Sequence, residues 1–269
     1  MNQAFVVKIQ NRKENIIMSV YALYFSPTYS TETIVKIVAT EFGAYKEIDL
    51  SKRENIENPS FNKEDICIIG VPSYGGRVPA IALERMKNIK GNNAKAVLVV
   101  SYGNRHYDDT VRELADFAVS KEFCCVAAIT AIAEHSIMHQ FAAGRPDAKD
   151  QEELRKFAKK ILDKITHLES CKELELLGNY PYREYNGVSF KPEVQKECAG
   201  CGICAKECPT GAISVMEPEK TNIEKCISCM RCIKVCPNKA RKLNPVMLEA
   251  VSSKMKEVCE KTKNNELFL

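Results

Sequence analysis

Eight of the thirteen cysteines lie in one short stretch and repeat a single spacing. Each repeat reads C-x2-C-x2-C-x3-C and is followed by proline, and the two repeats comprise Cys198, Cys201, Cys204 and Cys208, then Cys226, Cys229, Cys232 and Cys236. Thiolates at this spacing bind metal, and three of them on one tight loop can hold three corners of an iron–sulfur cubane. The fourth corner needs a ligand from elsewhere in the chain. The spacing therefore predicts two 4Fe-4S clusters.

The double run resembles the cluster-binding segment of bacterial-type ferredoxins, in which the fourth cysteine of each run ligates the other cluster. This resemblance assigns Cys198, Cys201, Cys204 and Cys236 to a first cluster, and Cys226, Cys229, Cys232 and Cys208 to a second cluster. Crossed ligands tie the two repeats into one unit. The prolines that follow, Pro209 and Pro237, remove a backbone donor and turn the chain away from each cluster.

Two other interpretations of the cysteines fit the spacing poorly. Zinc sites use pairs of C-x2-C but close with four ligands, which leaves no use for a third regularly spaced cysteine in each run. A disulfide framework suits small secreted chains, whereas this chain has 269 residues and no N-terminal signal-peptide pattern. We therefore expect a protein of a reducing compartment, located in the cytoplasm.

The chain is long enough for a second domain with its own core. The clusters need only residues 193–242, while residues 18–168 have the size of an ordinary domain. Residues 1–17 precede a second methionine and are expected to form an N-terminal extension. Residues 169–192 are expected to form a linker, and residues 243–269 a C-terminal helix.

Charge and hydropathy argue against a membrane span and against nucleic acid as a partner. No apolar run approaches the roughly 20 residues that span a bilayer, so we expect no membrane span. The net charge of +4 is too small and too evenly spread to predict nucleic-acid binding. Residues 193–242 carry nine Lys and Arg against six Glu, an excess that either balances anionic clusters or docks an acidic partner.

Strand-like and helix-like patterns alternate through residues 18–168. Apolar runs predict strands over residues 19–25, 65–71, 94–100 and 123–129, and a further short strand is expected over residues 47–50. Amphipathic patterns predict helices that contain Ile34 and Val38, that begin near Pro79, that contain Val111 and Leu114, and that contain Leu154 and Ile161. This alternation predicts an α/β fold with a five-stranded, doubly wound parallel sheet. Such sheets bind ligands at the carboxyl ends of their strands.

Three loops at those strand ends carry unusual residues. The loop of residues 26–31 places four hydroxyl groups at a helix N-terminus, where they and free backbone N–H groups can hold a phosphate. The loops of residues 72–79 and 101–108 combine aromatic rings with glycines, which let backbone approach a flat ring system. Together the loops predict a nucleotide-like ligand with a phosphate and an aromatic ring.

With these loops, residues 19–168 resemble a short-chain flavodoxin. The whole chain resembles the fused flavodoxin/bacterial-type ferredoxin family of anaerobic prokaryotes. The resemblance implies FMN as a cofactor, with its phosphate at residues 26–31 and its ring between Tyr74 and Tyr102. The implied cofactor-binding residues are Ser26, Thr28, Tyr29, Ser30, Thr31, Pro72, Ser73, Tyr74, Gly75, Gly76, Ser101, Tyr102, Gly103, Asn104, Tyr107 and Asp108.

One position departs from the family pattern. Tyr29 and Ser30 stand where such phosphate loops often carry Gly-Asn. A positive φ at position 29 would be costly for tyrosine.

Other chemically capable residues are less constrained by the sequence. Glu134, His135 and Ser136 follow the fifth predicted strand, where they either approach the flavin rim or form a capping turn. Cys67, Cys124 and Cys125 lie in strands and are expected to be small buried residues, and no function follows for Cys171 or Cys259. No pair of residues spaced for acid–base or nucleophilic catalysis occurs, so no catalytic residue is predicted.

The predicted function is electron transfer between an external redox partner, two 4Fe-4S clusters and FMN. A flavin exchanges electrons in pairs or singly, whereas each cluster handles one at a time, so a chain with both can relay or split electron flow. The partner is either a redox protein or a small-molecule electron donor or acceptor. Two alternatives stay open: an FMN-dependent reductase of a small oxidised substrate, and a flavin-free iron–sulfur module that senses redox state.

Overall fold

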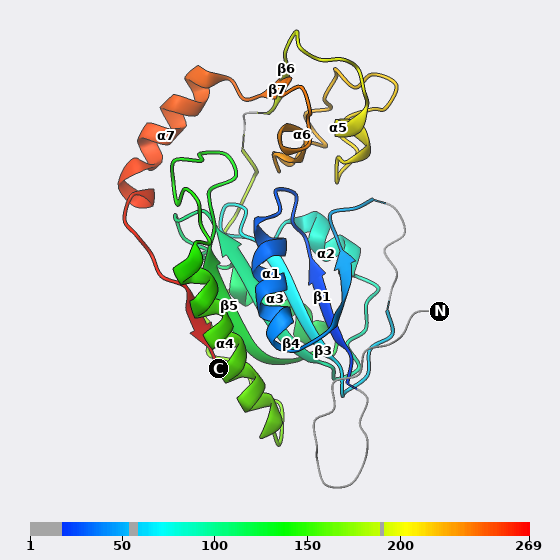
Figure 1. The fold of residues 1–269 in the computed structure, drawn as a ribbon, viewed down its shortest axis with the longest axis vertical. Helices are drawn as coiled ribbons and strands as arrows, with labels where there is room; N and C mark the ends of the chain where they lie inside the picture. The colour runs from blue at the N-terminus through cyan, green and yellow to red at the C-terminus, as the bar shows by residue number, and fades with distance from the viewer. Residues whose placement is uncertain (1–17, 54–58, 189–190) are drawn as a thin grey trace.

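The computed structural model describes residues 18–53, 59–188 and 191–269 (Figure 1). The expected N-terminal extension over residues 1–17 lies outside the described residues. A twisted sheet with helices on both faces forms the larger part, and the cluster-binding segment, residues 193–242, lies beyond one end of it. Among the described residues, no helix is both long and apolar enough to span a bilayer.

The sheet contains the five predicted parallel strands. These are β1 (Val20–Tyr24), β2 (Tyr45–Asp49), β3 (Ile66–Pro72), β4 (Lys95–Tyr102) and β5 (Cys124–Ile132). Their order is β2-β1-β3-β4-β5, and each neighbouring pair is parallel. This is the flavodoxin-like doubly wound order, with a switch point between β1 and β3. The predicted α/β fold class is confirmed.

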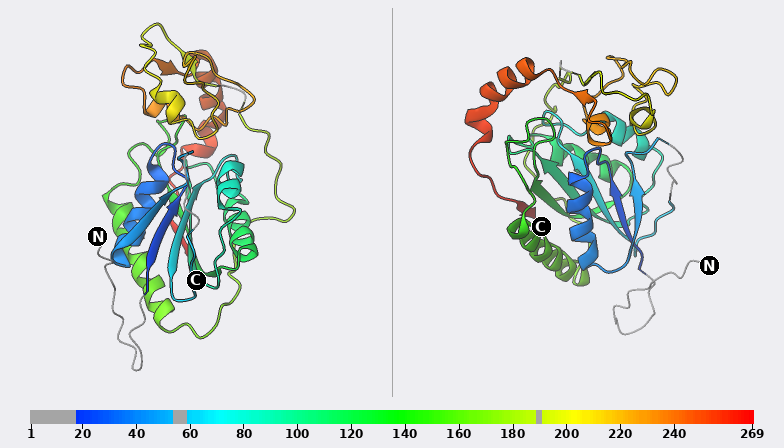
Figure 2. Two further views of the ribbon diagram at one scale, coloured as in Figure 1. Left: turned by 90° about the vertical axis from the view of Figure 1, so that its right-hand side faces the viewer. Right: turned by 45° about the horizontal axis from the view of Figure 1, so that its top comes forward.

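Four of these strands, β1, β3, β4 and β5, are nearly continuous apolar runs because helices cover both faces of the sheet, whereas β2 is more exposed (Figure 2). On one face, α1 (Ser30–Glu41) and α4 (Ala148–Thr166) bury residues such as Ile34 and Leu154. On the other face, α2 (Ala80–Met86) and α3 (Thr110–Ser120) bury residues such as Met86 and Leu114. Two apolar layers therefore hold the carboxyl ends of the strands, and the loops that follow them, in fixed positions.

The C-terminal tail is more than the expected helix. Helix α7 (Pro245–Cys259) begins where the Asn244 side chain accepts hydrogen bonds from two backbone N–H groups. The chain then returns to the sheet as β8 (Glu266–Phe268), which pairs antiparallel with β5 as a sixth strand. The Asn265 side chain anchors this return, since it accepts from the Ile132 N–H at 2.9 Å. Figure 1 shows α7 descending from the cluster-binding segment to the sheet.

The cluster-binding segment is small and has little regular structure. A two-stranded antiparallel ribbon, β6 (Glu193–Val194) and β7 (Arg241–Lys242), closes its ends together. Two single-turn helices, α5 (Ile203–Lys206) and α6 (Arg231–Lys234), occupy equivalent places in the two cysteine runs. Each starts at a residue in the left-handed conformation, Gly202 in one run and Met230 in the other.

The segment before it is tied to the sheet domain. Asp109 accepts from the backbone N–H groups of Asn179 at 2.8 Å and Arg183 at 2.7 Å. The Tyr182 hydroxyl donates to Asp116 at 2.6 Å. These bonds hold the predicted linker across the loops that follow β3 and β4.

Two cysteines that the sequence left unpaired form a disulfide. Cys124, at the start of β5, is bonded to Cys171, and their Cα atoms lie 5.7 Å apart, within the usual range for disulfides. The expectation that Cys124 is an unpaired buried residue is therefore wrong. The bond closes a loop around α4, since the two residues are separated by 47 positions.

We expect this pair to crosslink under oxidising conditions. Closing a loop of this length removes roughly 4 kcal/mol of chain entropy from the unfolded state in the entropic description. Peptide mapping of air-exposed, non-reduced protein should recover Cys124 joined to Cys171, while Cys67 and Cys125 stay alkylatable after unfolding. Recovery of Cys124 as a free thiol under these conditions would contradict the pairing.

Candidate iron–sulfur and flavin sites

The four thiols assigned to the first cluster surround one cavity. Its lining includes Cys198, Cys201, Cys204 and Cys236, together with residues of α5 and the turn after Cys236. The Ala240 N–H donates to the Cys236 sulfur at 3.3 Å. Such N–H bonds to sulfur tune the reduction potential of a bound cluster. Cys201 is exposed, so this cavity lies at the surface of the chain.

The four thiols assigned to the second cluster are also brought together. Burial raises the pKa of Cys229 to about 12, the Arg231 N–H opposes this, and the charges of Cys232, Cys208 and Cys226 raise it further. Cys208, which belongs to the first run in sequence, thus lies close to the thiols of the second run. Cys236, from the second run, is likewise close to Cys204 of the first run. Burial raises the pKa of Cys204, Arg241 lowers it, and the charge of Cys236 raises it again.

The spacing of the thiols suits a cage rather than a single ion. In the described part of the chain, no three His, Cys, Asp or Glu side chains converge tightly enough to hold one metal ion. The four thiols assigned to the first cluster surround a cavity, as the ligands of a cubane do. The eight thiols fit two 4Fe-4S clusters, and the crossed assignment of the fourth ligands stays a prediction.

The loop after β1 divides its hydroxyl groups between two tasks. Ser26 is buried and accepts from the Glu32 N–H at 2.9 Å, which satisfies a backbone donor in the first turn of α1. Thr31 is buried and shares a hydrogen bond with Ser101 at 2.7 Å. Thr28 and Ser30 are less buried, and both line a cavity beside the N-terminus of α1. Thr28 and Ser30 are therefore the side chains best placed to donate to a phosphate there.

A larger cavity, which we call the ring chamber, adjoins this phosphate cavity. The two cavities share Ser73, Tyr74, Tyr102, Gly103, His135 and Ser136 as walls. The ring chamber has a volume of about 450 Å³, within the usual range for small-molecule sites. Its apolar lining and the adjoining hydroxyl groups match the two ends of FMN.

Three segments from outside the sheet domain roof the ring chamber. Tyr185 and Val188 come from the predicted linker, Ile227 and Ser228 from the second cysteine run, and Val251 and Met255 from α7. Sequence reasoning missed all six, and only the aromatic content of the linker could have pointed to Tyr185. A Cβ atom at Gly75 would lie 2.2 Å from the Tyr185 ring, so glycine is required there for the linker to pack. The roof residues thus cover part of the chamber.

Several predicted FMN residues take structural roles instead. Tyr107 is fully buried and donates from its hydroxyl to Glu266 at 2.7 Å, which fastens β8. Asp108 pairs with Arg105 and Arg183 and does not line either cavity. Tyr102 lines both cavities, but its ring is buried edge-on against Tyr107. Pro72 and Ser101 line the phosphate cavity, while Gly76 packs beneath Asp108 and Arg183.

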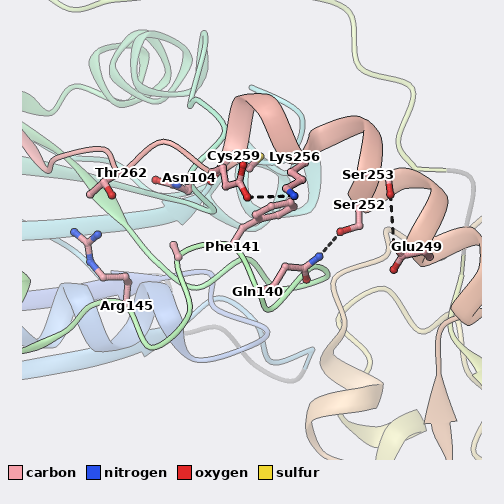
Figure 3. A pocket seen from close by; sticks show the side chains of 12 residues that line it. Asn104, Gln140, Phe141, Arg145, Glu249, Ser252, Ser253, Lys256, Cys259 and Thr262 are labelled. Atoms are coloured by element: carbon pink, nitrogen blue, oxygen red, sulfur yellow. Dashed lines mark hydrogen bonds and ion pairs between the residues drawn. The ribbon is translucent and has the colours of Figure 1, made fainter.

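The side chain of Asn104 lies beside the end of α7 (Figure 3). Its amide nitrogen donates to the backbone oxygens of Cys259 at 2.6 Å and Lys261 at 3.0 Å. It lines a separate polar cavity of about 420 Å³ between α7 and the segment that contains Gln140 and Arg145. Asn104 thus holds α7 over the sheet, and it lines neither the phosphate cavity nor the ring chamber.

His135 stands behind Gly103 at the junction of the two cavities. Its Nδ1 atom accepts from the backbone N–H groups of Ile137 at 3.1 Å and Met138 at 3.2 Å, so the proton resides on Nε2. Burial, reinforced by the charges of His139 and Arg105, lowers the pKa of His135 to about 4. The neutral imidazole is therefore a hydrogen-bond donor to the site at neutral pH, and not a store of charge.

This shift makes stability depend on pH with a definite sign. In the unfolded chain the histidine pKa returns to about 6.5, so between pH 6.5 and 4 the unfolded state binds more protons and acid destabilises the fold. We expect a loss of at most about 3 kcal/mol in unfolding free energy across that interval from this residue. Thermal unfolding midpoints measured across the interval should fall less steeply in His135→Gln, whose amide keeps an acceptor but does not titrate. Equal slopes would contradict a buried neutral histidine.

The geometry defines a class of protein: a flavodoxin-like α/β domain followed by a domain that holds two 4Fe-4S clusters for electron transfer. Residues 197–241 match the protein family described as a 4Fe-4S dicluster domain. The chain is similar to one component of the ion-translocating oxidoreductase complex of Methanosarcina acetivorans, with 43% identity over 58 residues. It is also similar to the polyferredoxin protein MvhB of Methanothermus fervidus, with 35% identity over 72 residues.

These similarities are partial. The matches cover 21% and 25% of this chain and only 22% and 18% of those two relatives. Among solved structures, a flavodoxin of Streptococcus pneumoniae aligns with a TM-score of 0.40 and 18% identity, covering 55% of this chain and 99% of the flavodoxin. Flavodoxin 1 of Bacillus cereus aligns with a TM-score of 0.39 and 16% identity, covering 56% of this chain and 99% of that one.

Proposed function

We propose that this protein relays electrons between an external redox partner, its two 4Fe-4S clusters and FMN bound in the ring chamber. When bound, FMN would supply the ability to exchange electrons in pairs or singly. The observation that carries the proposal is the composition of the chamber wall. Ile227 and Ser228, which lie between two second-cluster ligands, face the same cavity as Tyr74 and Gly103.

A second contact supports the same arrangement. Burial raises the pKa of the Tyr74 hydroxyl, and the neighbouring Cys229 thiol raises it further, so this second-cluster ligand lies close to the chamber wall. The exposed first-cluster ligand, Cys201, lies in the other run. The second-cluster thiols are thus on the side of the flavin site, and the first-cluster thiols offer an edge to an external partner.

The residues around the chamber have distinct tasks in this proposal. Thr28 and Ser30 donate to the phosphate, and Tyr74 lines the ring site. His135 holds a proton at Nε2 at the junction of the two cavities. Tyr185 and Met255 are part of the roof that excludes water. The same roof favours electron relay over the reduction of a bulky organic substrate, because such a substrate would have to displace the linker or α7.

Cofactor analysis of protein prepared without oxygen tests the proposal. We expect iron and sulfide for two clusters, and one FMN taken up per chain. Electrons given to the clusters by a low-potential donor protein should bleach the flavin absorption. Iron and sulfide without flavin, even after incubation with FMN, would favour the flavin-free sensing module. Steady turnover of a quinone or nitro compound would favour the reductase.

A further inference from the structure

The backbone of the phosphate loop is strained at Tyr29, whose bonds within its own domain come from its backbone to Ser26 and Thr33. Tyr29 has φ 73°, the left-handed region, which bulky residues rarely adopt. Its side chain is 40% exposed, so burial in the sheet domain does not account for the conformation. Glycine or asparagine would adopt this backbone at lower cost.

The Tyr29 ring contacts two basic side chains of the cluster-binding segment, Arg231 and, at 5.9 Å from the ring centroid, Lys234. The Arg231 guanidinium lies 4.7 Å from the centroid of the Tyr29 ring, a cation–π contact. The same group donates from Nη1 to the backbone oxygen of Pro27 at 3.1 Å. Arg231 is only 7% exposed, so these contacts are shielded from solvent. Two residues of the phosphate loop, Pro27 and Tyr29, therefore contact the same side chain.

The other end of Arg231 belongs to the second cluster. Its backbone N–H bonds to the Cys229 thiol, and it stands between Cys229 and Cys232 in the chain. Its Nε donates to Glu207 at 3.0 Å, and Nη2 donates to the same carboxylate. Glu207 directly precedes Cys208, the crossed ligand of the second cluster. Arg231 thus contacts both segments that carry second-cluster ligands: the second cysteine run, through Cys229, and the residue before Cys208, through Glu207.

We propose that Arg231 and Tyr29 form a clamp that couples the two cofactor sites, so that FMN binding and second-cluster retention stabilise each other. The inference rests on the proposed binding of FMN. Coupling between two sites is reciprocal for binding free energies. If cluster binding increases the affinity for FMN, FMN binding therefore increases the affinity for the second cluster by the same factor. Arg231 is accordingly a positioning residue for the phosphate site, and it acts through Pro27 and Tyr29.

FMN titration of the cluster-loaded full chain tests the clamp. Tyr29→Asn removes the ring but suits a positive φ, and Arg231→Lys keeps the charge but loses the planar stack and the forked donors. Each should weaken FMN affinity by roughly tenfold, within the usual range for coupled sites. The double variant should lose no more than the larger single loss, because the two residues act as one unit. Lys206→Ala, on the exposed face of α5, is the matched control and should bind FMN normally.

Tyr29→Asn separates the clamp from simple backbone strain. If local strain alone mattered, relieving it would leave FMN affinity unchanged or improved, and the clamp would be overturned. The reciprocal measurement is iron loss to a chelator: FMN should slow loss of the second cluster in the wild type, and this protection should vanish in Tyr29→Asn. FMN binding to wild type and both variants with equal affinity overturns the clamp alone. No FMN binding to the wild type overturns the proposed function and the clamp with it.

Discussion

Cys208→Ser is expected to remove the second cluster and leave the first, so that iron and sulfide each fall by about half. The reason is spatial: Cys208 belongs in sequence to the first run, but its thiol acts on Cys229 and Cys232 of the second run. Serine is isosteric but a far poorer iron ligand, and Cys208 is buried, so no solvent-exposed thiol can replace it. Flavin content should persist, while electrons supplied to the remaining cluster should no longer reach the flavin at the wild-type rate.

A set of four variants turns this expectation into a test of crossed ligation. The electron paramagnetic resonance spectrum of reduced Cys208→Ser should match that of Cys226→Ser, and the spectrum of Cys236→Ser should match that of Cys201→Ser. Cys259→Ala, which removes a buried thiol outside both runs, should keep its full iron content. If Cys208→Ser instead matches Cys201→Ser, each run holds its own cluster and the assignment of fourth ligands is wrong.

The second large effect is expected at the phosphate cavity. Thr28→Ala should weaken FMN binding by about tenfold or more, because a hydrogen bond to a charged group contributes roughly 1.5–3 kcal/mol. Thr28 and Ser30 line the cavity without being fully buried, whereas the hydroxyls of Ser26 and Thr31 are buried and bonded to the protein. Fluorescence titration of FMN into flavin-depleted, cluster-loaded protein measures the change, and iron content should not alter.

Two further substitutions, in the loop and in α1, serve as controls for the Thr28→Ala result. Thr40→Ala, at the far end of α1, removes a hydroxyl that donates to the Lys36 backbone oxygen and should leave FMN affinity unchanged. Ser26→Ala should lower stability by about 1 kcal/mol through the lost bond to the first turn of α1. An equal loss of iron in Thr28→Ala would show that the phosphate loop is not the ligand of a flavin but part of the cluster site.

The local chemistry of the cysteines could be predicted from the chain alone. Ligand spacing within a run is a property of a few consecutive residues, and the same is true of the apolar runs that form β1, β3, β4 and β5. The loops that follow these strands could be placed at one edge of the sheet because parallel strands share a direction. Each of these inferences needs only contacts between residues near in sequence, or a symmetry of the sheet.

The contacts between distant segments could not be predicted in this way. Tyr185, Ile227 and Met255 meet over the ring chamber only after the linker, the second run and α7 have folded back on the sheet. None of them carries a local pattern that distinguishes a cavity wall from an ordinary apolar residue.

The same limit explains the two loops in which the prediction and the structure differ most. Asn104 and Tyr107 have the residue types of a ligand loop, yet their side chains fasten α7 and β8, which pack there from more than 150 positions away in the chain. Tyr29 looked unsuitable for a phosphate loop because the sequence does not show which residue contacts its ring. That residue, Arg231, also bonds to Pro27, from which it is separated by 204 positions in the chain. The cysteine spacing and the parallel strands could be predicted because spacing and periodicity are local properties of the chain. Which side chains face the ring chamber depends on packing between remote segments, which sets the direction of each side chain and is visible only in the folded protein.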